Sequence, residues 1–282
     1  MNYAQDALWW RLTHPTIRDL ASLLTAPPLW HTSCELPTRE LLGEHGFRLL
    51  LAWDEQWQSD PQRQPENLTR NRYALGKYAE DLFAYWFTHA PHAKLLAANL
   101  PVYGNEAGGN STLGEMDYIA ELNGTLYHIE LACKYHGSAT GEHMAGLNPR
   151  DTLERKQRKL QRQLALLARP EAQAALRRHG IAPERIRSAN IVRGIGFTAA
   201  GTLPPAFPPQ AWSGIWTTTP QVLPEHARYY RLPRTEYLAP ARITQPETIS
   251  RSQITPAALY AQVAPRPDGY WHEEQRIMVV AG

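Results

Sequence analysis

The residues in this sequence that could do chemistry together are two acids, Asp117 and Glu130, and the nearby Lys134. The acids stand in two segments of alternating apolar and polar residues that are joined by Asn123-Gly124. Asn-Gly between such segments is the strongest short-range signal for a β-hairpin. A two-residue turn there would place the two carboxylates directly opposite one another, about 5 Å apart, where they repel each other. We therefore expect a cation between them: the ammonium group of Lys134, which lies on the same face, or a divalent metal ion.

Two neighbouring carboxylates suit Mg²⁺ or Mn²⁺, because Mg²⁺ is typically held by one or two carboxylates together with water and substrate phosphates. Such a metal ion polarises a phosphoryl oxygen and acidifies a water molecule, and a nearby ammonium group positions that water or offsets developing charge. The pattern therefore predicts hydrolysis of a phosphodiester. Asp117, Glu130 and Lys134 are the expected catalytic residues, and Asp117 and Glu130 are the expected metal ligands.

The other face of the hairpin is apolar and is expected to pack on the core, with Met116, Tyr118, Ala120, Tyr127, Ile129, Leu131, Cys133 and Tyr135. This placement argues against a zinc site at the C-x-x-H spacing of Cys133 and His136, because Cys133 faces the core and a zinc site needs about four ligands. A Ser or Cys nucleophile is not indicated either, since the chain has no G-x-S-x-G or comparable signature.

An acid on one strand, a hairpin, and then an acid followed by a lysine on the next strand resemble the PD-(D/E)XK nuclease superfamily, whose members share the restriction-endonuclease-like fold. The pieces GEMDYI and HIELACKY also resemble an uncharacterised bacterial family of unknown function assigned to that superfamily, and this likeness covers most of the chain. The usual motif has its lysine two residues after the second acid, where this chain has Ala132. Lys134 stands two residues further along, on the same face of the strand but displaced by about 6 to 7 Å.

The resemblance implies an α/β fold with a mixed sheet flanked by helices, and a further metal ligand from the helix before the first strand. That helix is expected at 69–89, where Lys77 and Asp81 form an i,i+4 pair on the solvent side. Glu80 lies among aromatic residues, and a glutamate in such surroundings needs a partner or a metal ion to stay ionised. Glu80 is therefore either a third metal ligand, as the resemblance implies, or a partly exposed surface residue.

A strongly basic helix is expected at 151–168, with its start at Asn148-Pro149. Between Arg150 and Arg169 there are seven Lys or Arg residues and two acids, a net charge of +5, compared with +2 for the whole chain. This helix is the best candidate for contact with a phosphate backbone. A solvated basic face is the alternative. The predicted nucleic-acid contacts are Arg155, Lys156, Lys159, Arg162 and Gln163.

The expected organisation is an N-terminal helical extension at 1–68, a nuclease-like α/β core at 69–200 and a C-terminal extension at 201–282 that packs on the core. Further helices are expected at 16–24, 38–57, 172–179 and near 255–263. Strands are expected at 94–103, 190–198, 214–218, 228–238 and 275–280, with a glycine-rich loop at 104–111. The N-terminal tryptophans are expected to pack in the core rather than stack on bases.

Composition is that of a globular protein, with 43% hydrophobic and 20% charged residues. The two cysteines, Cys34 and Cys133, do not indicate a disulfide framework. The N-terminal residues lack the layout of a signal peptide, and no apolar run approaches the ~20 residues of a membrane span. We therefore expect a cytoplasmic protein without membrane contact.

These observations predict metal-dependent hydrolysis of nucleic-acid phosphodiester bonds, with DNA favoured over RNA. Two alternatives stay open. The displaced Lys134 favours a catalytically inactive nuclease-fold protein that binds nucleic acid or a protein partner. The third interpretation is a scaffold in which Asp117, Glu130 and Lys134 form a structural salt-bridge cluster.

Overall fold

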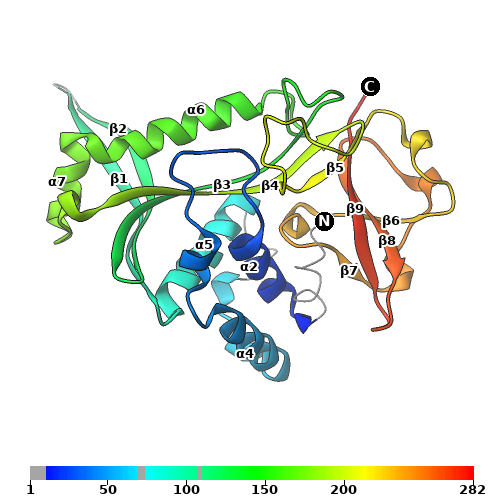
Figure 1. Ribbon diagram of the computed structural model, residues 1–282, viewed down its shortest axis with the longest axis horizontal. Helices are drawn as coiled ribbons and strands as arrows, with labels where there is room; N and C mark the ends of the chain where they lie inside the picture. The colour runs from blue at the N-terminus through cyan, green and yellow to red at the C-terminus, as the bar shows by residue number, and fades with distance from the viewer. Residues whose placement is uncertain (1–10, 69–73, 107–108) are drawn as a thin grey trace.

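The computed structural model of the 282-residue chain describes residues 11–68, 74–106 and 109–282. It is an α/β structure with a mixed, largely antiparallel sheet flanked by helices (Figure 1). The described helices are α2 (Pro15–Thr25), α3 (Thr38–Leu42), α4 (Gly46–Ser59), α5 (Leu75–His89), α6 (Leu153–Leu164) and α7 (Pro170–Arg178). The described strands are β1 (Ala93–Glu106), β2 (Gly109–Leu122), β3 (Thr125–Gly137), β4 (Arg187–Thr198), β5 (Ser213–Thr217), β6 (Arg228–Arg231), β7 (Arg242–Ile243), β8 (Ala258–Pro265) and β9 (Trp271–Val279).

Within the described residues, nine strands form one sheet in the order β1-β2-β3-β4-β5-β9-β8-β6, with β7 paired to β9. The pairs β1–β2 and β2–β3 are antiparallel, as are β6–β8, β7–β9 and β8–β9, whereas β3–β4, β4–β5 and β5–β9 are parallel. Two parallel strands need a crossover connection, and α6 and α7 lie in the connection from β3 to β4. The C-terminal strands therefore continue the sheet that carries the two acids.

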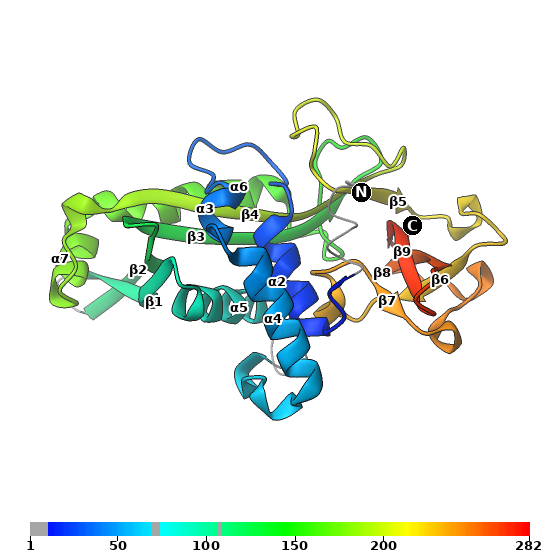
Figure 2. The same cartoon turned by 60° about the horizontal axis from the view of Figure 1, so that its bottom comes forward.

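Different helices cover the two faces of the sheet, as Figures 1 and 2 show. On one face, α6 lies over β3 and β4 and α7 packs against β1, whereas α2, α4 and α5 lie on the other face. The larger core cluster lies on the α5 side, and a smaller one, which includes Ala132 and Leu160, lies under α6. The face of β3 that carries Glu130 and Ala132 therefore looks toward α6.

The hairpin turn is confirmed. Leu122 pairs with Thr125, and both Asn123 and Gly124 have positive φ, 48° and 78°. A two-residue turn of type I′ requires positive φ at both central positions, which is why Asn-Gly predicts it so well.

The apolar face of the hairpin is confirmed at Tyr118, Ala120 and Ile129, which lie in the larger core cluster. Met116 is an exception, because it packs with Ile119 in the cluster beneath α7. Regular pairing of β2 with β3 ends at Tyr118, whereas Met116 remains paired with Leu100 of β1.

The helix expected near 255–263 is wrong, because this segment is strand β8, which pairs with β6 on one side and β9 on the other. Ala, Leu and Gln favour a helix locally, but pairing with two strands supplies long-range backbone hydrogen bonds that outweigh this preference. The loop expected at 104–111 is also wrong in the described residues. Strands β1 and β2 remain paired up to Glu106 and Gly109, and residues 107 and 108 lie outside the described ranges.

Two expected helix boundaries also differ. The helix expected at 38–57 is divided into α3 and α4 at Gly43, whose φ of 60° ends the first piece. The basic helix begins at Leu153, since the side chain of Thr152 accepts a hydrogen bond from the Arg155 N–H and caps it. The expected helix at 69–89 is described from Leu75, and residues 69–73 lie outside the described part.

The expected helices at 16–24 and 172–179 correspond to α2 and α7, and the expected strand at 190–198 corresponds to β4. Trp30, Trp53 and Trp57 are buried, as expected, whereas Trp9 and Trp10 lie outside the described residues.

The division of the chain into three regions stays a prediction, although the larger core cluster takes residues from all three, among them Leu20, Tyr78 and Leu238. In the described part of the chain, no helix has the length and apolar character needed to cross a bilayer.

Candidate functional site

Asp117 and Glu130 lie side by side at the point where β2 separates from β3. The pairing of the two strands ends at Tyr118 and Ile129, and the acids are the next residue on each strand. Beyond this point the two strands are linked by hydrogen bonds from backbone to side chain. The Leu131 N–H donates to Asp117 Oδ2 at 2.8 Å, and the Asp117 N–H donates to Glu130 Oε1 at 3.3 Å. The structure thus brings the two predicted acids together.

Both carboxyl groups are buried, with exposed fractions of 9% for Asp117 and 0% for Glu130. Burial and the charge of Glu130 raise the pKa of Asp117 to about 7, against the opposing effects of the Leu131 N–H and Lys159. Burial likewise raises the pKa of Glu130 to about 8. Two such carboxyl groups hold a proton near neutral pH unless a cation takes its place.

His128 is a member of the site to which the sequence pattern assigned no role. Its side chain is fully buried, and its Nε2 lies 2.7 Å from Glu130 Oε1. Burial lowers the pKa of His128 to about 4, so the imidazole is neutral at pH 7. Donation from Nε2–H would hold Glu130 in one orientation. The signal in the sequence is the two-residue spacing of His128 and Glu130, which puts both side chains on one face of a strand.

Lys134 and Lys159 differ in their relation to the two acids. In the described structure, Lys134 makes no ion pair with either acid and lines a separate cavity with Lys156. The cation whose charge lowers the pKa of both Asp117 and Glu130 is Lys159, on α6. Because α6 packs across β3, a lysine remote in sequence reaches the electrostatic neighbourhood of the acids.

Glu80 is half-buried on α5, and its backbone carbonyl accepts a hydrogen bond from the Tyr118 hydroxyl at 2.7 Å. Burial raises the pKa of its carboxyl group, as does the charge of Asp117, whereas Lys77 at 3.6 Å lowers it. Lys77 also pairs with Asp81 at 3.0 Å, as expected. Among the described residues, no three His, Cys, Asp or Glu side chains converge as metal ligands. The role of Glu80 as a third ligand stays a prediction.

The two carboxylates nevertheless fit a Mg²⁺ site of the kind that water and substrate complete. Glu130 Oε2 is buried and has no hydrogen-bond partner in the described structure. An unpaired buried oxygen is costly, and a cation between it and Asp117 would satisfy it. Mg²⁺ needs only one or two protein carboxylates when water and phosphate oxygens supply its other ligands.

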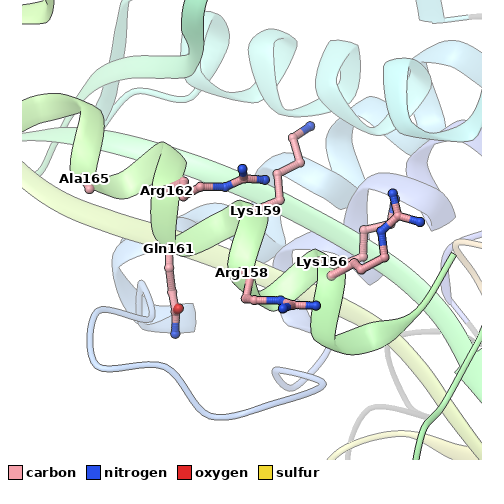
Figure 3. Close-up of a pocket in the computed structure, with 7 residues that line it drawn as sticks. Lys156, Arg158, Lys159, Gln161, Arg162 and Ala165 are labelled. Carbon is pink, nitrogen blue, oxygen red and sulfur yellow. The ribbon is translucent and has the colours of Figure 1, made fainter.

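Basic side chains reach outward from α6 around a hollow in its surface (Figure 3). Of the predicted nucleic-acid contacts, Arg155, Lys156, Lys159 and Arg162 line this hollow, and Gln163 does not. Arg155, Lys159 and Arg162 are exposed, whereas Lys156 pairs with Asp151 at 2.6 Å. Such a concentration of positive charge beside the acids is suited to attract a polyanion.

A family model described as a domain of unknown function (DUF1853) matches residues 18–280 of the chain. The match includes the hairpin with the two acids, the basic helix and the C-terminal strands. No curated protein and no solved structure matches.

Proposed function

The chain belongs to the DUF1853 family, and from its site we propose that it hydrolyses phosphodiester bonds of nucleic acid, DNA in preference to RNA, with Mg²⁺ or Mn²⁺. One observation carries the proposal. Asp117 and Glu130 lie adjacent and buried beneath a helix rich in Lys and Arg, and one carboxylate oxygen, Glu130 Oε2, has no hydrogen-bond partner among the described residues.

The contacts of the two acids support the roles that we propose for them. Asp117, fixed by the Leu131 N–H, and Glu130, fixed by His128, would hold the metal ion. When bound, the metal ion supplies Lewis-acid activation of the phosphoryl oxygen and of the attacking water. His128 acts as a positioning residue, because it contacts Glu130 and leaves Glu130 Oε2 available.

Lys159 takes the role that the usual motif gives to a lysine on the second strand. Its charge acts on both carboxyl groups, and its side chain is exposed, so its ammonium group is available to a substrate phosphate above the pair. An ammonium group in that position offsets the negative charge that develops as a phosphodiester is attacked.

We also propose that the fold is of restriction-endonuclease type. Three features support this: the acids lie on an antiparallel hairpin, a helix precedes that hairpin, and a crossover through α6 leads to the parallel strand β4. The alternative is a nuclease-like protein that binds nucleic acid without cleaving it. The separation of Lys134 from the acids favours that alternative.

The test is cleavage of linear, nicked, branched and single-stranded DNA and RNA, in Mg²⁺ or Mn²⁺, by the wild type and Glu130→Gln. We expect the wild type to cleave at least one substrate and Glu130→Gln to lose about 100-fold or more in rate, because it lacks a charged metal ligand. Lys159→Met should lose about tenfold or more.

Glu121→Gln and Lys94→Met are the controls, because Glu121 is exposed on β2, Lys94 is exposed opposite it on β1, and both lie several residues from the acids. Both should cleave as the wild type does. Equal cleavage by the wild type and Glu130→Gln would refute the proposed site. Binding without cleavage by every variant would establish the non-catalytic alternative instead.

A further inference from the structure

A second polar cavity, of about 760 Å³, lies beyond the acids along β3. Its walls are the C-terminal half of β3, the first turn of α5, the segment that leads into α6, and parts of the C-terminal region. Helices α5 and α6 lie on opposite faces of the sheet. A cavity that both helices line therefore lies at the edge of β3 that β2 leaves unpaired beyond Ile129.

The lining is strongly cationic. Among the described residues it has one acid, Asp151, and five bases: Lys134, Arg150, Arg155, Lys156 and Arg234. Burial, together with the charge of Lys156, lowers the pKa of Lys134. The ammonium group of Lys134 has no ion-pair partner in the described structure, since Asp151 is engaged by Lys156 at 2.6 Å. The cavity therefore has more positive charge than its own acid can balance.

His136 adds an unpartnered polar group to the same lining. It is 1% exposed, and neither of its ring nitrogens has a hydrogen-bond partner within the described ranges 11–68, 74–106 and 109–282. The nearest carboxylate oxygen, Asp151 Oδ2, is 3.8 Å from Nε2, which is beyond hydrogen-bond distance. Buried polar groups are almost always paired, so this imidazole indicates a partner that the described residues do not supply.

The first turn of α5 contributes backbone donors. Its N-cap residue, Ala74, makes no side-chain hydrogen bond to the first N–H groups of this 15-residue helix. Gly76, in that turn, also lines the cavity, and no atom of the described residues lies within 4 Å of the position that a Cβ would take there. The N-terminus of a helix favours an anion.

We propose that this cavity binds a phosphate group, held by Lys134, Lys156 and the first turn of α5, and that Asp151 pairs with Lys156 until the phosphate replaces it. The source of the phosphate rests on the proposed function: it is the backbone of the strand whose scissile bond lies at Asp117 and Glu130. Lys134 stands four residues beyond Glu130 on the same face, roughly 13 Å of strand rise. That distance corresponds to roughly four base-pair steps along the axis of a duplex.

The experiment uses the full chain without metal, so that nothing is cleaved. Binding of a fluorescent DNA oligonucleotide is measured by anisotropy over a series of salt concentrations, and the melting temperature is measured with sodium phosphate against sodium chloride of equal ionic strength. The variants are Lys134→Met, Asp151→Asn and the exposed control Lys94→Met.

We expect Lys134→Met to weaken DNA binding about tenfold and to reduce the salt slope by about one unit, as the loss of one phosphate contact does. Asp151→Asn should tighten binding several-fold, because it removes the acid that competes for Lys156. Misfolding does not explain a gain in affinity, so Asp151→Asn still tests the phosphate site even if Lys134→Met folds poorly. Lys94→Met should bind as the wild type does.

Unchanged DNA binding and unchanged phosphate stabilisation in both cavity variants would overturn the proposal. A response only in the stabilisation by inorganic phosphate would support a phosphate cavity while overturning its link to nucleic acid. These experiments measure binding and not cleavage. A protein that binds phosphate in this cavity but does not cleave nucleic acid would therefore be recognised as such.

Discussion

Asp117 and Glu130 are buried acids whose pKa values in the folded protein lie above those of the unfolded chain. Each retains a proton on folding that the unfolded chain has already released at neutral pH. Their contribution to stability is therefore lost as the pH rises from about 4, where unfolded carboxyl groups ionise, to about 7 or 8, where the folded ones do. The candidate site thus opposes folding of the metal-free protein at neutral pH, which is common for groups placed for chemistry.

Asp117→Asn should consequently stabilise the metal-free protein. At pH 8 we expect an increase of roughly 2 to 4 kcal/mol in the free energy of unfolding, because about three pKa units separate the folded and unfolded acid. The amide still accepts from the Leu131 N–H and donates toward Glu130. Urea unfolding at pH 8, 6 and 4 measures the effect, which should shrink toward zero at pH 4.

Mg²⁺ should reduce the difference in unfolding free energy between Asp117→Asn and the wild type at pH 8. It is expected to bind the two ionised carboxylates of the folded wild type and not the variant. Glu121→Gln, at an exposed acid of the same strand, should change stability little at any pH. A loss of stability in Asp117→Asn at pH 8 would mean that Asp117 is paired favourably in the folded protein, contrary to the argument above.

At the scale of elements, the site depends on the parallel contact of β3 with β4, which holds the strand of Glu130 and Lys134 in place. Lys134 pairs with Gly194 in that contact. Gly194 has φ of 134°, and a Cβ there would overlap the backbone carbonyl oxygen of Lys134. Only glycine permits this approach, so one residue of β4 determines where β3 can lie.

Gly194→Ala should therefore cost about 3 kcal/mol or more, since both the backbone conformation and the contact are violated. Gly124→Ala is the matched comparison. Its φ of 78° is also unfavourable for alanine, but a Cβ there meets nothing within 4 Å, so about 1 kcal/mol is expected. The melting temperatures of the two variants measure this difference. An equal decrease in melting temperature for both would contradict the role assigned to Gly194.

At the scale of the whole molecule, the N-terminal helix and the last strand meet on the segment 237–241. In α2, Ser22 Oγ donates to the Leu238 carbonyl at 2.6 Å, and Arg18 donates to the Pro240 carbonyl at 3.0 Å. In β9, Arg276 donates to the Tyr237 and Ala239 carbonyls, each at 3.0 Å. The two ends of the described chain are therefore coupled through one short segment.

Arg276→Met should destabilise the protein by about 3 to 5 kcal/mol, because it leaves Glu273, now 2.6 Å from Arg276, as a buried and unpaired charge. Hydrogen exchange should rise in α2 as well as in β9, since segment 237–241 links them. Adding Glu273→Gln should recover a large part of the loss. Faster exchange confined to β8 and β9 would show that the two ends of the chain are not coupled.

Residue patterns within short segments were enough to predict much of the secondary structure and the proximity of the two acids. The Asn123-Gly124 turn and the two-residue period of a strand act over short distances, and they suffice to place Asp117 beside Glu130. Helix α7 and strand β4 followed in the same way from their own residues. His128 was within reach of the same rule, through its spacing from Glu130.

Only the tertiary structure decided which lysine accompanies the acids. Lys134 shares a face with Glu130 by alternation, yet it lies in a cavity with Lys156, and the cation that acts on both acids comes from α6. The strand state of β8 was likewise settled by its two partners rather than by its composition. Both outcomes depend on packing between segments far apart in the chain. Such contacts cannot be read from the residue pattern of one segment, because each segment contributes only one of the two contacting surfaces.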